Sequence, residues 1–314
     1  MRPRVSIVMP CYNAERHLPV SVGSVLAQSF QDWELIAIDD GSQDGTRAWF
    51  EAQHDPRIHI VTQANLGVSA ARNRGLTLCK GEYIGFLDSD DTWDREFLST
   101  LLAELDEYPD AVLAYCGWQN LGLPGMRGQP FIPPDYEGPD KTRLLLESCR
   151  WPIHACLTRQ SAVQQVGGFD PELKIGEDFL FWMEVGQLGQ LRRVPKVLAF
   201  YHHHGDGQAT QDRGWAAIDT LRAKQKFLAH HPGVAQRLGE DWVEAVTWGK
   251  FVEQANALFW RGDIENARLL YKRALRAGRG TTRDKLRMLA CLLPAPLLKA
   301  IGKFEVRANP TDAP

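Results

Sequence analysis

The sequence predicts an α/β protein with a mostly parallel, twisted sheet flanked by helices and a helical C-terminal region. Three observations support this fold class. Over the first 118 residues, short apolar runs alternate with amphipathic stretches of helical length. Polar residues gather where several of these runs end, as they do at the carboxyl edge of a parallel sheet. From residue 215 onward, the pattern is helical throughout.

Five apolar runs in the first part are predicted as strands, and the segments between them as helices. Apolar strands that alternate with amphipathic helices are typical of a parallel sheet covered on both faces. The strands are expected at residues 4–10, 33–39, 57–62, 82–87 and 111–116, and the helices at residues 14–28, 44–53, 67–79 and 94–107.

The middle of the chain is predicted to be less regular. Residues 119–139 are rich in glycine and proline and have no period, so we expect a loop or lid there. The later elements expected are a helix near 140–148, a strand within 151–159, a helix near 160–166, a helix beginning near Glu177 and a strand near 191–200. The domain boundaries are therefore expected at residues 1–210 and 211–314.

Composition narrows the class of protein. A net charge of −3 and a pI near 6.3 argue against a nucleic-acid partner. The six cysteines form no C-x-x-C pair, and the start of the chain leaves no room for a signal peptide, so a cytoplasmic location is expected. The apolar segment 288–304, with basic flanks, is predicted either to pack on the core or to make a peripheral membrane contact.

Three aspartates end the predicted strand in "GEYIGFLDSDDTWD": Asp88, Asp90 and Asp91. Carboxylates this close raise one another's pKa unless a cation lies among them. Oxygen ligands without histidine or cysteine nearby in the sequence favour Mn²⁺ or Mg²⁺, which substrate phosphates commonly complete. The alternative is helix capping, in which Asp91 would cap the helix beginning near Asp94.

A second acidic pair follows another predicted strand in "WELIAIDDGSQDGT". Asp44 is expected to cap the next helix, but capping does not explain the adjacent Asp39 and Asp40. Because a strand alternates faces, only one of the pair can point into a cleft, where it could accept from a ribose hydroxyl or a base N–H. No Walker A or G-x-G-x-x-G motif occurs, so the standard phosphate loops are not expected.

Three further stretches each allow two interpretations. Arg72 in "NLGVSAARNRGL" is either a solvated helix residue or a contact to a nucleotide or its phosphates. Glu177 and Asp178 in "IGEDFLFWMEV" suit a helix start, and either could be a general base. His202 and His204 in "YHHHGDGQAT" are either surface residues or contacts to an acceptor, a phosphate or a metal.

Together these stretches resemble glycosyltransferase family 2, the inverting nucleotide-sugar transferases with the GT-A fold. The matching stretches are "VSIVMPCYNAERHL", "ELIAIDDGSQDGT", "NLGVSAARNRGL", "GEYIGFLDSDD" and "GGFDPELKIGED", in the family's order and spacing. They cover about residues 4–204. The chain lacks the transmembrane helices and the Q-x-x-R-W motif of the family's processive members.

The resemblance implies roles for particular residues. The residues that it places around the nucleobase and ribose are Pro10, Tyr12, Asn13 and Asp40, with Tyr12 stacking on the base. Arg72 would lie near the nucleotide, and Asp39 stays the alternative to Asp40. Asp88 and Asp90 match the family's D-x-D motif, with Asp90 the preferred ligand of Mn²⁺ or Mg²⁺, and Asp178 matches the catalytic base.

The expected function is metal-dependent, inverting transfer of a sugar from a nucleoside diphosphate sugar, with UDP the family's commonest nucleotide. The acceptor would be a hydroxyl of a glycan or lipid-linked molecule, in polysaccharide synthesis. Residues 1–118 would bind the nucleotide and 140–210 the acceptor. Two alternatives are a nucleotidyltransferase, which usually needs a glycine-rich basic loop that "MPCYNAERHL" lacks, and a non-catalytic sugar-nucleotide binding or scaffold protein. Intact Asp88, Asp90 and Asp178 argue against the second.

Overall fold

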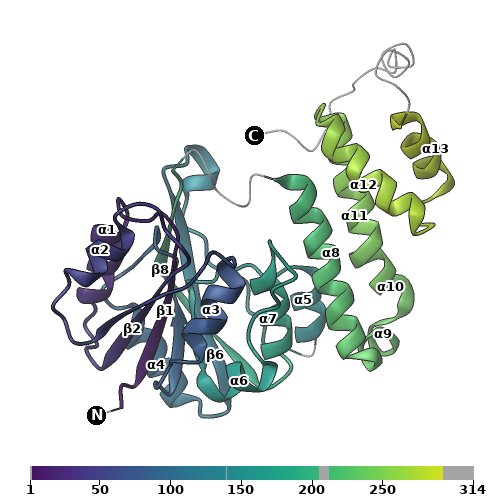
Figure 1. Ribbon diagram of the computed structural model, residues 1–314. Coiled ribbons are helices and arrows are strands. Elements are labelled where there is room, and N and C mark those ends of the chain that lie inside the picture. The colour runs from purple at the N-terminus through teal and green to yellow at the C-terminus, as the bar shows by residue number, and fades with distance from the viewer. Residues whose placement is uncertain (1, 139, 205–211, 293–314) are drawn as a thin grey trace. The chain divides into compact units, whose positions relative to one another are not determined.

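The chain divides into two compact units, Met1–Gln208 and Ala209–Pro314. The computed structural model describes residues 2–138, 140–204 and 212–292. Within these residues, the first unit holds one eight-stranded sheet with the order β3-β2-β1-β4-β7-β6-β8-β5 (Figure 1). Each unit is described separately below.

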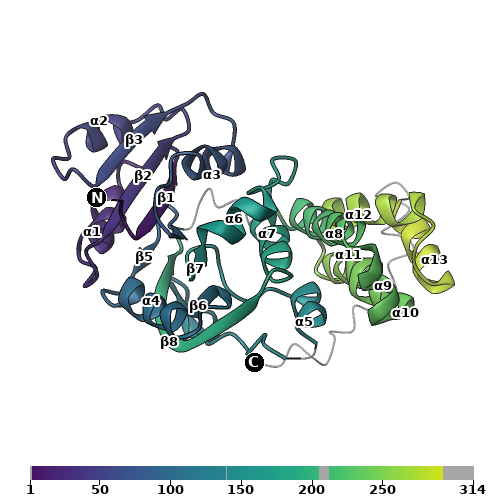
Figure 2. The same cartoon turned by 90° about the horizontal axis from the view of Figure 1, so that it is seen from below.

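The first half of the sheet is parallel, as the sequence predicts. Its strands are β1 (Val5–Cys11), β2 (Trp33–Asp39), β3 (Ile58–Thr62) and β4 (Tyr83–Phe86). Every residue of β1 and β2 is buried, which explains why both read as near-continuous apolar runs. Helices α1 (Leu18–Leu26) and α3 (Val68–Leu76) flank these strands from opposite sides (Figure 2). All four strands therefore present their carboxyl ends at one edge.

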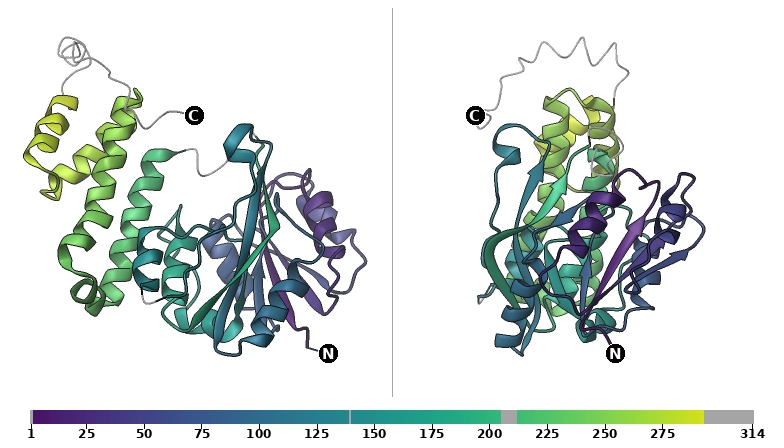
Figure 3. Two further views of the ribbon diagram at one scale, coloured as in Figure 1. Left: turned by 180° about the vertical axis from the view of Figure 1, so that it is seen from behind. Right: turned by 90° about the vertical axis from the view of Figure 1, so that its left-hand side faces the viewer.

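The second half of the sheet is mixed. Its strands are β5 (Thr92–Trp93), β6 (Ala111–Leu121), β7 (Cys156–Arg159) and β8 (Gln190–His202). The strand β7 runs antiparallel to both β4 and β6, whereas β6 and β8 are parallel to each other. Because two reversals restore the direction, β6 and β8 end at the same edge as β4 (Figure 3).

The segment 119–139 is more ordered than the sequence predicts. The strand β6 continues to Leu121 because it pairs with β8 along its whole length, up to Leu121 opposite His202. A short 3₁₀ helix, Gly125–Gly128, follows, and Phe131 then returns to bridge Trp118. Pairing with a distant strand, which the local composition cannot report, overrides the glycine and proline content.

The remaining helices of the first unit lie close to their predicted positions. They are α2 (Thr46–Glu51), α4 (Phe97–Glu107), α5 (Lys141–Glu147), α6 (Gln160–Val166) and α7 (Glu177–Val185). The helix α1 begins at Leu18 rather than at residue 14, because Pro19 occupies its first turn, where a missing N–H costs nothing.

The second unit is helical. Its elements are α8 (Arg213–His230), α9 (Pro232–Leu238), α10 (Glu240–Glu244), η3 (Ala245–Gly249), α11 (Lys250–Trp260), α12 (Ile264–Arg276) and α13 (Thr282–Cys291). Phe251, Leu270 and Tyr271 belong to its buried core. The predicted apolar segment 288–304 extends past the described residues at 293, so its packing or membrane role stays a prediction. Among the helices of the described ranges, none has both the length and the apolar character needed to cross a bilayer.

Candidate active site

The ends of β1 and β2 are tied together by the turn at Asn13. Asn13 has a φ of 51°, in the left-handed region that asparagine tolerates better than most residues. Its backbone N–H donates to Ser42 Oγ at 2.9 Å, and its side-chain oxygen accepts from the N–H of Gln43 at 2.8 Å. Tyr12, which follows the buried Pro10 and Cys11, is 50% exposed. The turn therefore leaves the Tyr12 ring available for stacking.

Asp39 and Asp40 are both buried but have different partners. Asp40 accepts three hydrogen bonds, from Gln63 Nε2 at 2.8 Å and from the N–H groups of Leu66 at 2.9 Å and Gly67 at 2.8 Å. Asp39 Oδ1 accepts one, from the N–H of Ser42 at 2.9 Å. Within the described residues, nothing donates to Asp39 Oδ2. The structure therefore commits Asp40 to the loop that precedes α3 and leaves Asp39 with a free oxygen.

Each of the three aspartates after β4 has different surroundings. Asp88 Oδ1 accepts from Arg72 Nη2 at 2.7 Å. Asp91 Oδ2 lies 3.0 Å from His154 Nδ1, and both side chains are fully buried. Asp91 does not cap α4, contrary to the alternative drawn from the sequence, because that helix begins at Phe97 with no side-chain cap. Asp88 and Asp91 thus each contact a basic side chain of the protein itself, Arg72 and His154.

Asp90 is the exception. Among the described residues, its nearest basic side chain is the imidazole of His204, whose Nε2 lies 3.8 Å from Asp90 Oδ2. Burial, with the charges of Asp91 and Asp88, raises the pKa of Asp90 to about 7. A carboxylate held in this way would be stabilised as an anion by an added cation.

The residues around Asp90 fit a hard divalent ion that is completed by its substrate. Within the part of the chain that the structure describes, no three histidine, cysteine, aspartate or glutamate side chains form a metal-binding group by themselves. Mg²⁺ and Mn²⁺ are commonly held by one or two carboxylates together with water and substrate phosphates. Asp90 and Asp88 supply such a pair, with His204 beside them.

Arg72 joins the aspartates to the start of α7. It is 3% exposed, and its Nη1 donates to Glu177 Oε1 at 2.5 Å while Nη2 contacts Asp88. Its guanidinium also lies 5.4 Å from the centre of the Phe169 ring. The structure thus places Arg72 between two carboxylates, Asp88 and Glu177. A contact to the nucleotide stays a prediction.

Glu177 and Asp178 start α7 after Gly176, whose φ of 77° favours glycine. Glu177 is buried and paired with Arg72, so it is a poor candidate for a proton acceptor. Asp178 is partly exposed, and its Oδ1 accepts from the N–H of Phe179 at 2.7 Å. Burial, with the charge of Glu177, raises the pKa of Asp178 to about 7, although Arg72 opposes this shift.

The histidines at the end of β8 reach the same edge. The backbone N–H of His202 donates to Asp91 Oδ1 at 2.9 Å, and its Nε2 lies 2.9 Å from Thr92 Oγ1. His204 approaches Asp90, and its ring lies 4.1 Å from that of His17. Of the two histidines predicted as ligand contacts, His204 is therefore the one whose side chain lies beside Asp90.

Sequence reasoning missed His154. It lies in "WPIHACLTR", an apolar run predicted as a strand, where a buried imidazole needs a partner. The histidine within an apolar run could have indicated a buried, paired imidazole, but the sequence does not show that its partner is Asp91. Burial alone would lower the pKa of His154, but the Asp91 carboxylate outweighs burial and raises it.

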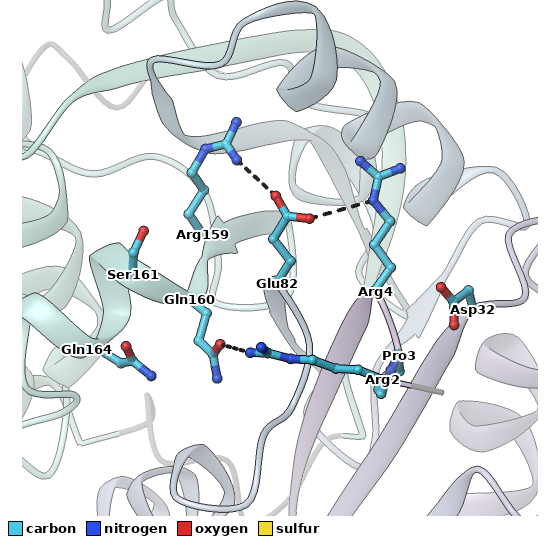
Figure 4. A pocket seen from close by; sticks show the side chains of 9 residues that line it. All are labelled: Arg2, Pro3, Arg4, Asp32, Glu82, Arg159, Gln160, Ser161 and Gln164. Atoms are coloured by element: carbon cyan, nitrogen blue, oxygen red, sulfur yellow. Dashed lines mark hydrogen bonds and ion pairs between the residues drawn. The ribbon is translucent and has the colours of Figure 1, made fainter.

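A hollow of about 540 Å³ lies at the opposite edge of the sheet, where β1 and β4 begin (Figure 4). Glu82 lies between Arg159 and Arg4, with oxygens 3.4 Å from Arg159 Nη1 and 4.0 Å from Arg4 Nε. Arg2 donates to the Gln160 side chain at 3.0 Å. The arginines that line the hollow already contact groups of the protein, and the hollow lies at the edge of the sheet away from Asp88 and Asp90. We therefore do not place the activity of the protein in this hollow.

Comparison with known proteins shows the family to which the chain belongs. The family described as glycosyl transferase family 2 matches residues 6–164. The glycosyltransferase TuaG of Bacillus subtilis (strain 168), named for teichuronic acid biosynthesis, is 32% identical over 192 residues. That match covers 60% of this chain and 74% of TuaG.

Two solved structures share the fold. S. aureus TarS 1–349 in complex with UDP-GlcNAc has a TM-score of 0.60 at 17% identity, covering 96% of this chain and 92% of that chain. The mannosyltransferase PcManGT from Pyrobaculum calidifontis, in complex with GDP-Man and Mn²⁺, has a TM-score of 0.55 at 19% identity, covering 97% of this chain and 89% of that chain. These likenesses confirm the predicted GT-A type fold.

Proposed function

Because the chain belongs to glycosyl transferase family 2, we propose that it is a metal-dependent, inverting glycosyltransferase of polysaccharide biosynthesis. The donor would be a nucleoside diphosphate sugar, with UDP as the preferred nucleotide, and the acceptor a hydroxyl of a glycan or lipid-linked molecule. The names of TuaG and of the TarS and PcManGT complexes support this class of reaction. Family membership favours it over the nucleotidyltransferase and the non-catalytic protein.

One observation carries the proposal: among the described residues nothing donates to Asp178 Oδ2, and the charges of Arg72 and Asp88 act on the same carboxyl group. With Oδ1 occupied by the N–H of Phe179, Oδ2 would accept the proton of the acceptor hydroxyl. The acceptor oxygen then bonds to the anomeric carbon on the face opposite the diphosphate. The bond from that carbon to the diphosphate oxygen breaks, and its electron pair leaves with the nucleoside diphosphate. A single displacement of this kind inverts the anomeric centre.

Asp90 and Asp88 are the residues that would hold Mn²⁺ or Mg²⁺, with His204 as a third contact. When bound, such an ion supplies positive charge to the leaving diphosphate. Arg72 has a different role in this proposal. By pairing with both Asp88 and Glu177, it holds the aspartate segment and the start of α7 at a fixed separation.

The nucleoside would lie over the ends of β1 and β2. Tyr12 would stack on the base, beside the turn formed by Pro10 and Asn13. Between the two acidic neighbours, the hydrogen bonds favour Asp39 as the ribose or base contact, because Asp40 is already committed to Leu66 and Gly67. The enzyme would work in the cytoplasm, where scattered unpaired cysteines are expected.

Thermal shift with a panel of nucleoside diphosphate sugars, each with and without Mn²⁺, tests this function. A ligand that binds only the native state raises Tm. We expect a UDP-sugar to give the largest shift, and the shift to disappear with EDTA or in Asp90→Ala. A panel without any Mn²⁺-dependent shift would contradict the proposal.

A further inference from the structure

The buried pair of Asp91 and His154 has no role in the reaction as described so far. His154 is 0% exposed and Asp91 is 1% exposed, so neither can touch a substrate. The two facing atoms, Asp91 Oδ2 and His154 Nδ1, are 3.0 Å apart. A paired carboxylate and imidazole taken wholly out of water cost desolvation energy, so the contact is not explained by stability alone.

The pair lies where three distant segments of the chain meet. The segment that follows β4, residues 87–93, contacts His154 at two points. Besides the contact of Asp91, Trp93 Nε1 donates to the His154 carbonyl oxygen at 2.6 Å. On its other side, the same segment holds the end of β8 twice. Asp91 Oδ1 accepts from the N–H of His202, and Thr92 Oγ1 lies 2.9 Å from His202 Nε2. Asp91 is therefore shared between His154 and His202.

This arrangement fixes His204 relative to Asp90. Asp90 and Asp91 are adjacent, and they contact residues two apart at the end of β8, His204 and His202. If Asp91 turned away, the backbone of His202 would lose its hydrogen bond to this segment, leaving Thr92 as the remaining side-chain contact, and His204 would be held less firmly beside Asp90. The 3.0 Å contact between the second carboxylate oxygen of Asp91 and His154 Nδ1 opposes that rotation.

We propose that His154 and Asp91 form a positioning pair that holds the end of β8, and with it His204, beside Asp90. The inference rests on the proposed function, because Asp90 and His204 are the residues that would face the bound ion. Neither member of the pair touches the ion or the donor. Partners of this kind behind metal ligands typically change metal affinity about 10–100-fold when they are removed.

The test is the affinity for Mn²⁺ in the presence of UDP, measured by electron paramagnetic resonance of the free ion. His154→Leu should weaken Mn²⁺ binding by about 10–100-fold. His154→Asn keeps a donor near the Nδ1 position and should fold more readily, with a smaller but measurable loss. Tyr115→Phe is the control, because it removes the two hydrogen bonds of the Tyr115 hydroxyl on β6, one donated to the carbonyl oxygen of Pro134 and one accepted from the N–H of Tyr136. Its Mn²⁺ affinity should equal that of the wild type.

A double-mutant cycle separates positioning from general damage. If His154 acts through His204, His154→Leu should add little to the loss already caused by His204→Ala, and His154→Asn should behave in the same way. Wild-type Mn²⁺ affinity in whichever His154 variants fold, or fully additive losses, would overturn the positioning pair. Absence of Mn²⁺ binding in the wild-type protein would instead overturn the proposed function, and this inference with it.

Discussion

Asp178 and Glu177 are neighbours with the same chemical group, yet their contacts give them different roles. The Glu177 carboxylate is paired with the buried Arg72, whereas Asp178 is partly exposed and holds only its own helix start. A general base needs a free oxygen and a pKa near the working pH. Asp178 has both, with a pKa of about 7.

Replacing each acid by its amide separates the two roles. Asp178→Asn keeps the side chain's size but cannot accept the proton, so kcat for sugar transfer should fall about 10²–10⁴-fold. Binding of UDP and Mn²⁺ should barely change. Glu177→Gln should lower the free energy of unfolding, because it weakens the pair with Arg72. Its kcat should fall far less than that of Asp178→Asn. Near-wild-type transfer by Asp178→Asn would refute the assignment.

The pH dependence of kcat follows from the same residue. The base must be deprotonated, so the active fraction falls as the pH drops through the raised pKa of Asp178, about 7. Glu177→Gln removes a neighbouring charge that raises this pKa, so the acid limb of its profile should move to lower pH. A profile recorded for both proteins checks this. An unmoved acid limb would mean that another group titrates.

At the scale of elements, Asp40 anchors the loop that leads into α3. Asp40→Asn turns one acceptor oxygen into a donor that faces a backbone N–H, so it should lower the free energy of unfolding by about 1–3 kcal/mol. Asp39→Asn should leave stability unchanged and weaken UDP binding instead. Urea denaturation and calorimetry of both variants test this division. If Asp40→Asn unfolds normally and loses UDP, the two roles must be exchanged.

Arg72 connects α3 to α7 across the end of β4. Arg72→Met would leave the Asp88 and Glu177 carboxylates without their shared cation, and breaking a buried pair of this kind typically costs about 3–5 kcal/mol. The matched control is Arg74→Met, the same change at an exposed position of α3. Urea denaturation should show a large loss for the first variant and almost none for the second. Equal losses would mean that the pair contributes nothing particular.

The sequence predicts the elements of the first unit well where local pattern determines them. The apolar strand 33–39 and the helix 160–166 match β2 and α6 to the residue. The sequence does not predict a feature that depends on contact with a segment far away along the chain. The continuation of β6 to Leu121 depends on β8, and the pairing of Asp91 with His154 depends on the fold. Capping and charge patterns report neighbours in sequence, whereas both of these contacts join segments far apart along the chain.

At the scale of the whole molecule, the candidate site uses only the first unit. Its acids come from the ends of β2 and β4 and from the start of α7, all brought to one edge by strand direction. That placement is general for sheets of this class. The second unit, with its core around Phe251 and Tyr271, contributes none of the predicted donor residues within the described chain.

We propose above all that the reaction inverts the anomeric centre of a UDP-sugar in one displacement. Proton NMR of the sugar released slowly to water tests it without a known acceptor. The protein would be incubated with Mn²⁺ and a UDP-α-sugar chosen by the thermal-shift panel, with Asp178→Asn as the control. We expect the β anomer to appear first, and Asp178→Asn to release it about 10²–10⁴-fold more slowly. Early release of the α anomer by the wild-type protein would show that the reaction does not proceed by a single inverting displacement.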